Sequence, residues 1–144
     1  MVNSTYRKIL VPLDGSKCSE RALSEAIILA KQCNASIVGL YVLPFSPLSF
    51  RDIRIAKEKM YEEGKQFLAK VQTNVEKGGI TFQQKILEGS NPGEIISGFV
   101  NLNKNKVDLV MMGSRGMGGL KEAFLGSTSN YVMHKSKVPV MIIK

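Results

Sequence analysis

The sequence is poor in the side chains that most often hold metal ions or form covalent intermediates, with two cysteines and one histidine among 144 residues. Cys18 and Cys33 fall within one expected helix, where a rise of about 1.5 Å per residue separates them by roughly 22 Å. Neither belongs to a Cys-x-x-Cys pair, so we expect no disulfide, zinc site or redox chemistry. His134 lies near the end of the last expected helix, where we expect it to interact with the helix dipole. We therefore assign no catalytic residue.

Long apolar runs are also missing. No uninterrupted run reaches the roughly 18 residues that a membrane span needs, and residues 1–8 lack the apolar segment and cleavage site of a signal peptide. The apolar fraction of 44% is ordinary for a globular protein, and 144 residues suit one domain with a real core. We expect a single domain over residues 1–144 that is soluble, cytoplasmic and without a membrane partner.

Acidic residues are scarce relative to basic ones, 12 against 20, which leaves a net charge of +8 and raises the question of nucleic acid. The distribution of the charges argues against that partner. Residues 51–70 intersperse bases with acids as a solvated helix face does, and no block of five like charges occurs anywhere. No alternation of aromatic and basic residues suggests stacking on bases. We interpret the excess as solubility and general attraction for polyanions.

What the chain does have is a regular alternation of strand and helix patterns, without internal repeats or low-complexity linkers. Short right-handed connections between such elements build a mostly parallel sheet covered on both faces. We therefore predict an α/β fold: a single doubly wound, mostly parallel five-stranded sheet with helices on both faces. Strands are expected at 8–13, 36–43, 80–87, 107–112 and 138–143, and helices at 19–33, from 53 to the glycines at 78–79, from 92 through Val100, and at 127–135.

Local signals mark where several of these elements begin and end. Ser16 can cap the first helix, and Asn34 can end it in a left-handed conformation. Asn91 is a second expected cap, followed by a proline that suits the first helical turn. The strand at 80–87 is partly polar, which is typical of a sheet edge, and Pro139 places the last strand at an edge or marks its start.

The most informative segment is Gly113-Ser-Arg-Gly116, followed after nine residues by Gly126-Ser127. It leaves an apolar strand that has no alternation, as expected of a strand buried on both faces. Glycines let the main chain approach a ligand and adopt positive φ, and free N–H groups at a helix start attract anions. The segment therefore predicts a phosphate site at the carboxyl edge of the sheet, where α/β proteins bind ligands. The alternative is a plain glycine-rich surface loop.

Several familiar nucleotide and catalytic motifs are absent. Gly118 follows Gly113 at the Walker spacing, but Gly119 stands where the lysine should be. The nearest approach to a dinucleotide fingerprint, at residues 116–119, lacks the last glycine and follows a late strand. There is no Gly-x-Ser-x-Gly elbow and no kinase catalytic-loop set. The protein is therefore not a Walker-type NTPase, and we expect hydrolysis to be slow or absent.

Three segments carry a family pattern: residues 8–16 (KILVPLDGS), residues 89–92 (GSNP), and residues 108–116 (DLVMMGSRG) with the later Gly126-Ser127. Together they resemble the universal stress protein family, in its ATP-binding branch. The most specific part is the family's Gly-x2-Gly-x9-Gly-Ser/Thr pattern, which the sequence meets without departure. The resemblance spans essentially the whole chain and implies an adenine nucleotide alpha hydrolase-like fold with strand order 3-2-1-4-5.

The resemblance also implies a ligand, ATP or another adenine nucleotide with Mg²⁺ or Mn²⁺, and a set of residues around it. The adenine and ribose would be bounded by Pro12, Leu13, Asp14, Val42, Met112 and Gly113. The phosphates would be contacted by Ser114, Arg115, Gly116, Gly126, Ser127, Thr128 and Ser129. No residue is implied as a direct metal ligand, although Asp14 would approach a phosphate-bound cation or serve only as a turn residue.

Family members commonly dimerise through the last strand, and here Val140, Met141, Ile142 and Ile143 offer an apolar edge suited to a homodimer. Three functions remain open. The favoured one is a nucleotide-dependent regulatory or stress-response module with slow or no hydrolysis. The others are a weak ATP hydrolase or phosphotransfer enzyme, and a nucleotide-free interaction scaffold.

Overall fold

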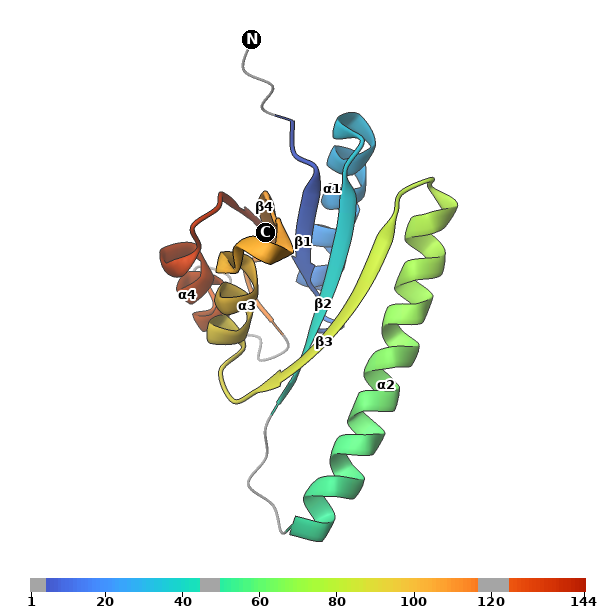
Figure 1. Cartoon of the computed structure of the whole chain (residues 1–144), viewed down its shortest axis with the longest axis vertical. Coiled ribbons are helices and arrows are strands. Elements are labelled where there is room, and N and C mark those ends of the chain that lie inside the picture. The colour runs from blue at the N-terminus through green and yellow to red at the C-terminus, as the bar shows by residue number, and fades with distance from the viewer. Residues whose placement is uncertain (1–4, 45–49, 117–124) are drawn as a thin grey trace.

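The chain forms one sheet of five parallel strands with helices on both faces, as the sequence predicts (Figure 1). The computed structural model describes residues 5–44, 50–116 and 125–144. The strand order is β3-β2-β1-β4-β5, and every neighbouring pair runs parallel. The strands are β1 (Lys8–Pro12), β2 (Ser36–Pro44), β3 (Phe82–Gly89), β4 (Leu109–Gly113) and β5 (Val140–Ile143).

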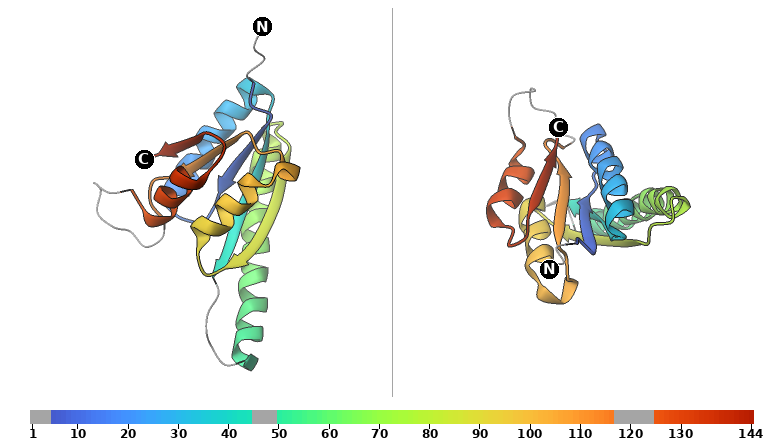
Figure 2. Two further views of the ribbon diagram at one scale, coloured as in Figure 1. Left: turned by 60° about the vertical axis from the view of Figure 1, so that its left-hand side comes forward. Right: turned by 90° about the horizontal axis from the view of Figure 1, so that it is seen from above.

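Two helices pack on each face of the sheet, with α1 and α2 on one side and α3 and α4 on the other (Figure 2). This is the doubly wound arrangement expected from the alternation of elements. The helices are α1 (Lys17–Cys33), α2 (Phe50–Lys77), α3 (Pro92–Asn101) and α4 (Ser127–Lys135), with a short 3₁₀ turn at Asn103–Asn105. None of the described helices is long and apolar enough to cross a membrane.

Each central strand contributes side chains to two separate cores. In β4, Leu109 and Met111 join the core beneath α1 and α2, whereas Val110 and Met112 join the core beneath α3 and α4. The same division holds in β1, where Val11 and Leu10 face opposite cores. This two-sided burial explains why both strands are apolar at successive positions rather than alternating.

At the amino edge of the sheet, the carboxylate of Asp108 joins the segment before β4 to the start of β1. Asp108 Oδ2 accepts hydrogen bonds from the backbone N–H groups of Arg7, at 2.8 Å, and Lys8, at 2.9 Å. At the opposite edge, the N–H of Leu13 donates to the carbonyl oxygen of Leu40 at 2.8 Å. These bonds fix β1 between β4 and β2, so the carboxyl ends of the two central strands are held side by side.

The strands lie where the sequence predicts them, but β3, β4 and β5 each begin two residues later than predicted, β4 at Leu109. β3 starts at Phe82, where its pairing with Ile37 of β2 begins. β5 starts at Val140, because Pro139 has no N–H to donate; its carbonyl oxygen still accepts from the N–H of Val110 at 3.0 Å.

The predicted helix signals are confirmed in detail. Ser16 Oγ accepts from the N–H of Ser19 at 3.2 Å, and Asn34 ends α1 with φ of 56°. Asn91 Oδ1 accepts from the N–H of Glu94 at 3.3 Å at the start of α3. Both cysteines lie in α1 as free thiols, which confirms that they do not pair.

Candidate functional site

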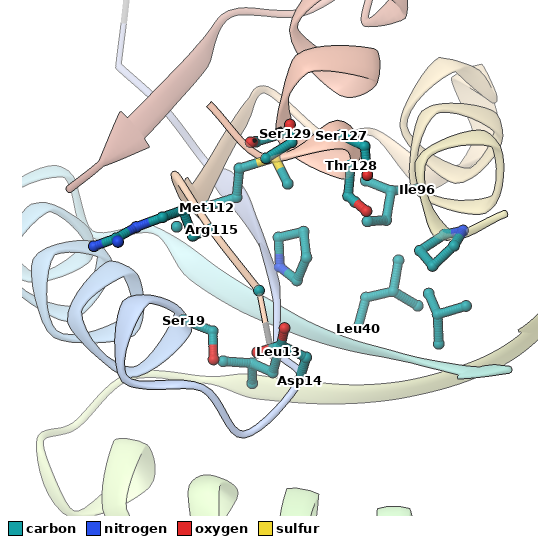
Figure 3. Close-up of a pocket in the computed structure, with 16 residues that line it drawn as sticks. Leu13, Asp14, Ser19, Leu40, Ile96, Met112, Arg115, Ser127, Thr128 and Ser129 are labelled. Atoms are coloured by element: carbon teal, nitrogen blue, oxygen red, sulfur yellow. Dashed lines mark hydrogen bonds between the residues drawn. The ribbon is translucent and has the colours of Figure 1, made fainter. Parts of the chain in front are cut away.

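The candidate site lies at the carboxyl end of β1 and β4, the two strands at the centre of the sheet. After β1 the chain passes through α1 to β2 on one side, and after β4 it passes through α4 to β5 on the other. Strand order therefore reverses between β1 and β4, and such a switch point opens a crevice above the sheet. A pocket of about 300 Å³ occupies this crevice (Figure 3).

Twelve of the thirteen predicted nucleotide-binding residues line this pocket, although they come from three separate parts of the sequence. The exception is Ser114, which lies beside the pocket. The twelve are Pro12, Leu13, Asp14, Val42, Met112, Gly113, Arg115, Gly116, Gly126, Ser127, Thr128 and Ser129. The pocket is also lined by four residues that were not among the predicted nucleotide contacts, namely Ser19, Leu40, Pro92 and Ile96.

One end of the pocket is apolar. Leu40 and Val42 of β2 line it together with Ile96 of α3, and Figure 3 shows Leu40 and Ile96 on the side of the pocket away from Arg115. Leu40 is two residues before Val42 and so shares its face of the strand, a signal by which the sequence indicates it. Ile96 carries no such signal, because only the packing of α3 over β2 brings it to the pocket. This end suits a flat, weakly polar group.

The other end is polar and is formed by two loops in contact. Asp14 Oδ1 accepts from the N–H of Ser16 at 2.9 Å, which orients its carboxylate toward the loop after β4. A β-carbon at position 116 would lie 2.7 Å from Asp14 Oδ2, so Gly116 permits this approach. Figure 3 shows Asp14 across the pocket from Ser127 and Thr128, whereas the Arg115 side chain extends away from them.

Helix α4 begins at the polar end and, among the described residues, is not capped by a side chain. Its cap residue is Gly126, which offers no oxygen to the first turn. The first N–H groups of a helix have no carbonyl partner within it, and together with the helix dipole they attract an anion. Ser127 is exposed and Thr128 half-buried, so their hydroxyls add two donors at the same place. This end suits phosphate.

Ser114 and Ser129 are placed differently from the other predicted phosphate contacts. Ser129 is 2% exposed, and its hydroxyl lies 2.9 Å from the carbonyl oxygen of Ser114 and 3.0 Å from that of Gly126. The N–H of Ser114 donates to the carbonyl oxygen of Ile143 at 2.9 Å. The two serines therefore bond to the protein's own backbone at the edge of the pocket.

The pattern glycines act through their missing β-carbons and not through positive φ, contrary to part of the expectation. Among the described glycines, positive φ occurs at Gly15 and Gly79. A β-carbon at Gly113 would lie 2.7 Å from Cys18 Cβ and 2.8 Å from its carbonyl carbon, so Gly113 lets the first turn of α1 contact β4. Part of the glycine pattern is thus required by the protein's own packing, whether or not a ligand is bound.

The predicted dimer edge is open along β5. Met141 is 42% exposed, and Val140, Ile142 and Ile143 are each partly exposed.

In the part of the chain that the structure describes, no group of three His, Cys, Asp or Glu side chains is close enough to hold a metal ion.

Comparison with known proteins identifies the family. A family model described as the universal stress protein family matches residues 5–144. The chain belongs to this family. The chain is 34% identical to universal stress protein MJ0531 of Methanocaldococcus jannaschii, over 96% of this chain and 82% of that protein. It is 30% identical to Sll1388 of Synechocystis, over 96% and 98% respectively.

The family fold is equally evident among solved structures. Universal stress protein UspA from Lactobacillus plantarum superposes with a TM-score of 0.87 over 99% of this chain and 100% of that one, at 24% identity. The structure of MJ0577 superposes with a TM-score of 0.84 at 29% identity, over 97% and 96% of the two chains. The sheet order inferred from the family resemblance is therefore confirmed both by the topology and by these relatives.

Proposed function

We propose that this universal stress protein binds an adenine nucleotide, with ATP favoured, in the pocket between β1 and β4. The observation that carries the proposal is the chemical division of that pocket into an apolar end and a donor-rich helix start. Related structures support the ligand class: one universal stress protein is described in complex with cAMP, and one from Archaeoglobus fulgidus in complex with dAMP. Both are 23% identical to this chain.

In this proposal the base lies at the apolar end and the phosphates at the start of α4. Leu40, Val42 and Ile96 would contact the base, whose flat faces favour apolar neighbours. Ser127 and Thr128 would donate to phosphate oxygens from their backbone and hydroxyl groups. The carboxylate of Asp14 faces the same end and fits Mg²⁺ or Mn²⁺, because phosphate oxygens would complete the coordination.

We propose a regulatory role rather than rapid turnover. Among the described residues that line the pocket, Asp14 is the only carboxylate, and its Oδ1 accepts the N–H of Ser16. The described lining holds no histidine, lysine or cysteine to act as base or nucleophile. A weak hydrolase remains the competing proposal. Phosphate release above background with Mg²⁺, lost in Asp14→Asn and Ser127→Ala, would establish it.

The first experiment is native mass spectrometry of the freshly purified protein, with and without ATP and Mg²⁺. We expect bound adenine nucleotide in the wild type and at least a tenfold weaker affinity in Gly116→Val, about 1.4 kcal/mol or more. The branched side chain would displace Asp14 and fill the polar end, while the exposed position spares the core. The matched control is Gly98→Ala in α3, where a β-carbon meets nothing within 4 Å. Protein that stays empty at millimolar ATP would favour the scaffold function.

We further propose that β5 pairs with β5 of a second copy. An open apolar strand edge is a ready template for pairing between chains. Met141→Asp tests this, because Met141 is the most exposed residue of the strand and its replacement disturbs the cores least. We expect a dimer for the wild type and a monomer for the variant by light scattering. A dimer that persists in Met141→Asp would move the interface elsewhere.

A further inference from the structure

Ser129 occupies an unusual position for a hydroxyl at the start of a helix. It is the third residue of α4, 2% exposed, and its Oγ is within hydrogen-bond distance of two carbonyl oxygens, those of Ser114 and Gly126. The N–H of Gly126 also donates to the carbonyl oxygen of Ser114, at 2.7 Å. Ser114, Gly126 and Ser129 therefore form a closed set of hydrogen bonds, which we call the serine clamp.

The serine clamp joins the chain that leaves β4 to the chain that enters α4. Ser114 is the first residue after β4, and Gly126 is the last before α4. The clamp is anchored to the sheet as well, because the N–H of Ser114 donates to the carbonyl oxygen of Ile143 in β5. The position of Gly126, and with it the direction of the first N–H groups of α4, is thus fixed against the sheet.

The hydroxyl of Ser129 is poorly suited to bind phosphate directly. A serine hydroxyl has one proton to donate, and a phosphate oxygen requires a donor. The Ser129 proton is directed to backbone carbonyl oxygens, and the side chain is buried. Ser127 and Thr128, with exposed and half-buried side chains, are free of this constraint. The contact implied by the family resemblance is therefore better met by these two neighbours.

We propose that Ser129 is a positioning residue: its hydroxyl holds Gly126 against Ser114 and so presets the N–H groups of Ser127 and Thr128 toward a phosphate. The part of this inference that concerns nucleotide rests on the proposed function. The part that concerns the clamp does not, because the bonds exist in the protein without a ligand. Preset donors bind more tightly than donors that must first be ordered, since the ordering cost is already met on folding.

The clamp is tested first without nucleotide, by amide hydrogen exchange in Ser129→Ala, Ser129→Thr and the control Ser97→Ala. Ser97 is similarly buried, at 5% exposed, but its hydroxyl has no hydrogen-bond partner among the described residues. We expect the Gly126 amide to exchange at least fivefold faster in Ser129→Ala and at the wild-type rate in Ser97→Ala. Threonine keeps a hydroxyl that can reach the same carbonyl and should restore slow exchange. Unchanged exchange in Ser129→Ala, or a rise shared equally by the Leu10 amide, overturns the clamp.

The nucleotide arm uses ATP and adenosine with the same variants in calorimetry. We expect Ser129→Ala to bind ATP roughly five- to tenfold more weakly and adenosine within twofold, with ATP binding rescued in Ser129→Thr. Weaker ATP binding with unchanged Gly126 exchange would make Ser129 a direct phosphate contact and overturn positioning. Faster exchange with unchanged ATP binding would overturn it as well. A wild type that binds neither ligand would refute the proposed function, while the exchange experiment still decides the clamp.

Discussion

The starts of α1 and α4 lie at the same edge of the sheet, follow neighbouring strands, and handle their unpaired N–H groups in opposite ways. Helix α1 follows β1 through a tight turn in which Gly15 has φ of 82°, and Ser16 caps the helix by accepting from the N–H of Ser19. Helix α4 starts at Gly126, which provides no side-chain cap. In α1 a side chain next to the helix accepts from one of the first N–H groups, whereas in α4 the first N–H groups have no side-chain acceptor among the described residues and face the pocket.

Two helices that begin at the same edge of the sheet therefore differ in whether their first N–H groups can accept an anion as partner. A capping oxygen at the start of α1 takes the place that an anion would occupy. Among the described residues, the start of α4 lacks such an oxygen. The buried hydroxyl of Ser129 instead bonds to the backbone carbonyl oxygens of Ser114 and Gly126, which leaves the first N–H groups of α4 available to the pocket. The proposed phosphate site therefore depends on the missing side-chain cap of α4, and not on a helix start as such.

The largest expected effect comes from separating the start of α1 from β4, the strand that leads to α4. Gly113→Ala places a β-carbon against the backbone and side chain of Cys18 in the first turn of α1. Because the nearest atoms include backbone that cannot move cheaply, we expect a loss of about 3 kcal/mol in the free energy of unfolding. Urea denaturation measures this. Gly98→Ala in α3 is the control and should gain about 0.5 kcal/mol or more, since alanine favours a helix and the position is open.

A second variant makes the start of α4 resemble that of α1. Gly126→Asp supplies a capping carboxylate, although its β-carbon would lie 3.1 Å from the carbonyl oxygen of Ser114 and must shift by a few tenths of an ångström. We expect ATP affinity to fall more than tenfold, since the carboxylate occupies the donors and repels phosphate, about 1.4 kcal/mol or more. The free energy of unfolding should change by less than about 1 kcal/mol. Undiminished ATP binding would mean that the phosphates do not lie at α4.

The smallest expected effect comes from removing the cap of α1. Ser16→Ala leaves the N–H of Ser19 without its acceptor, and we expect a loss of about 1 kcal/mol of stability. Affinity for ATP should stay within twofold, because Ser16 does not line the pocket. Thermal denaturation and calorimetry measure the two quantities. We expect the two helix starts to act independently. A large fall in ATP affinity would show instead that the start of α1 affects binding at the start of α4.

Much of the fold was accessible from the sequence because its signals are local. The caps at Ser16 and Asn91 and the left-handed stop at Asn34 each depend on a few neighbouring residues, and all three are confirmed. The apolar runs of β1 and β4 are explained by burial on both faces. The starts of β3, β4 and β5 were placed two residues too early, because hydrogen bonding to a neighbouring strand, and not composition, decides where a strand begins.

The family pattern predicted where the candidate site lies, but not which residues would line the pocket and which would bond to the protein's own backbone. Leu40 follows from the alternation of β2, whereas Ile96 and Ser19 reach the pocket only through the packing of their helices. Ser114 was expected to contact phosphate, yet its backbone joins β5 to the start of α4. Short-range patterns do not reveal such bonds, since the two partners lie far apart in the sequence.

By itself the sequence determined the alternation of elements, the burial of the central strands and the presence of a glycine segment before the last helix. These depend on hydropathy, side-chain shape and caps, which act over a few residues. Only the tertiary structure decided that Gly113 serves the contact with Cys18, that Gly116 serves the approach of Asp14, and that the Ser129 hydroxyl bonds to the carbonyl oxygens of Ser114 and Gly126. Those roles depend on distances between segments brought together by the sheet, and such distances exist only once the chain has folded.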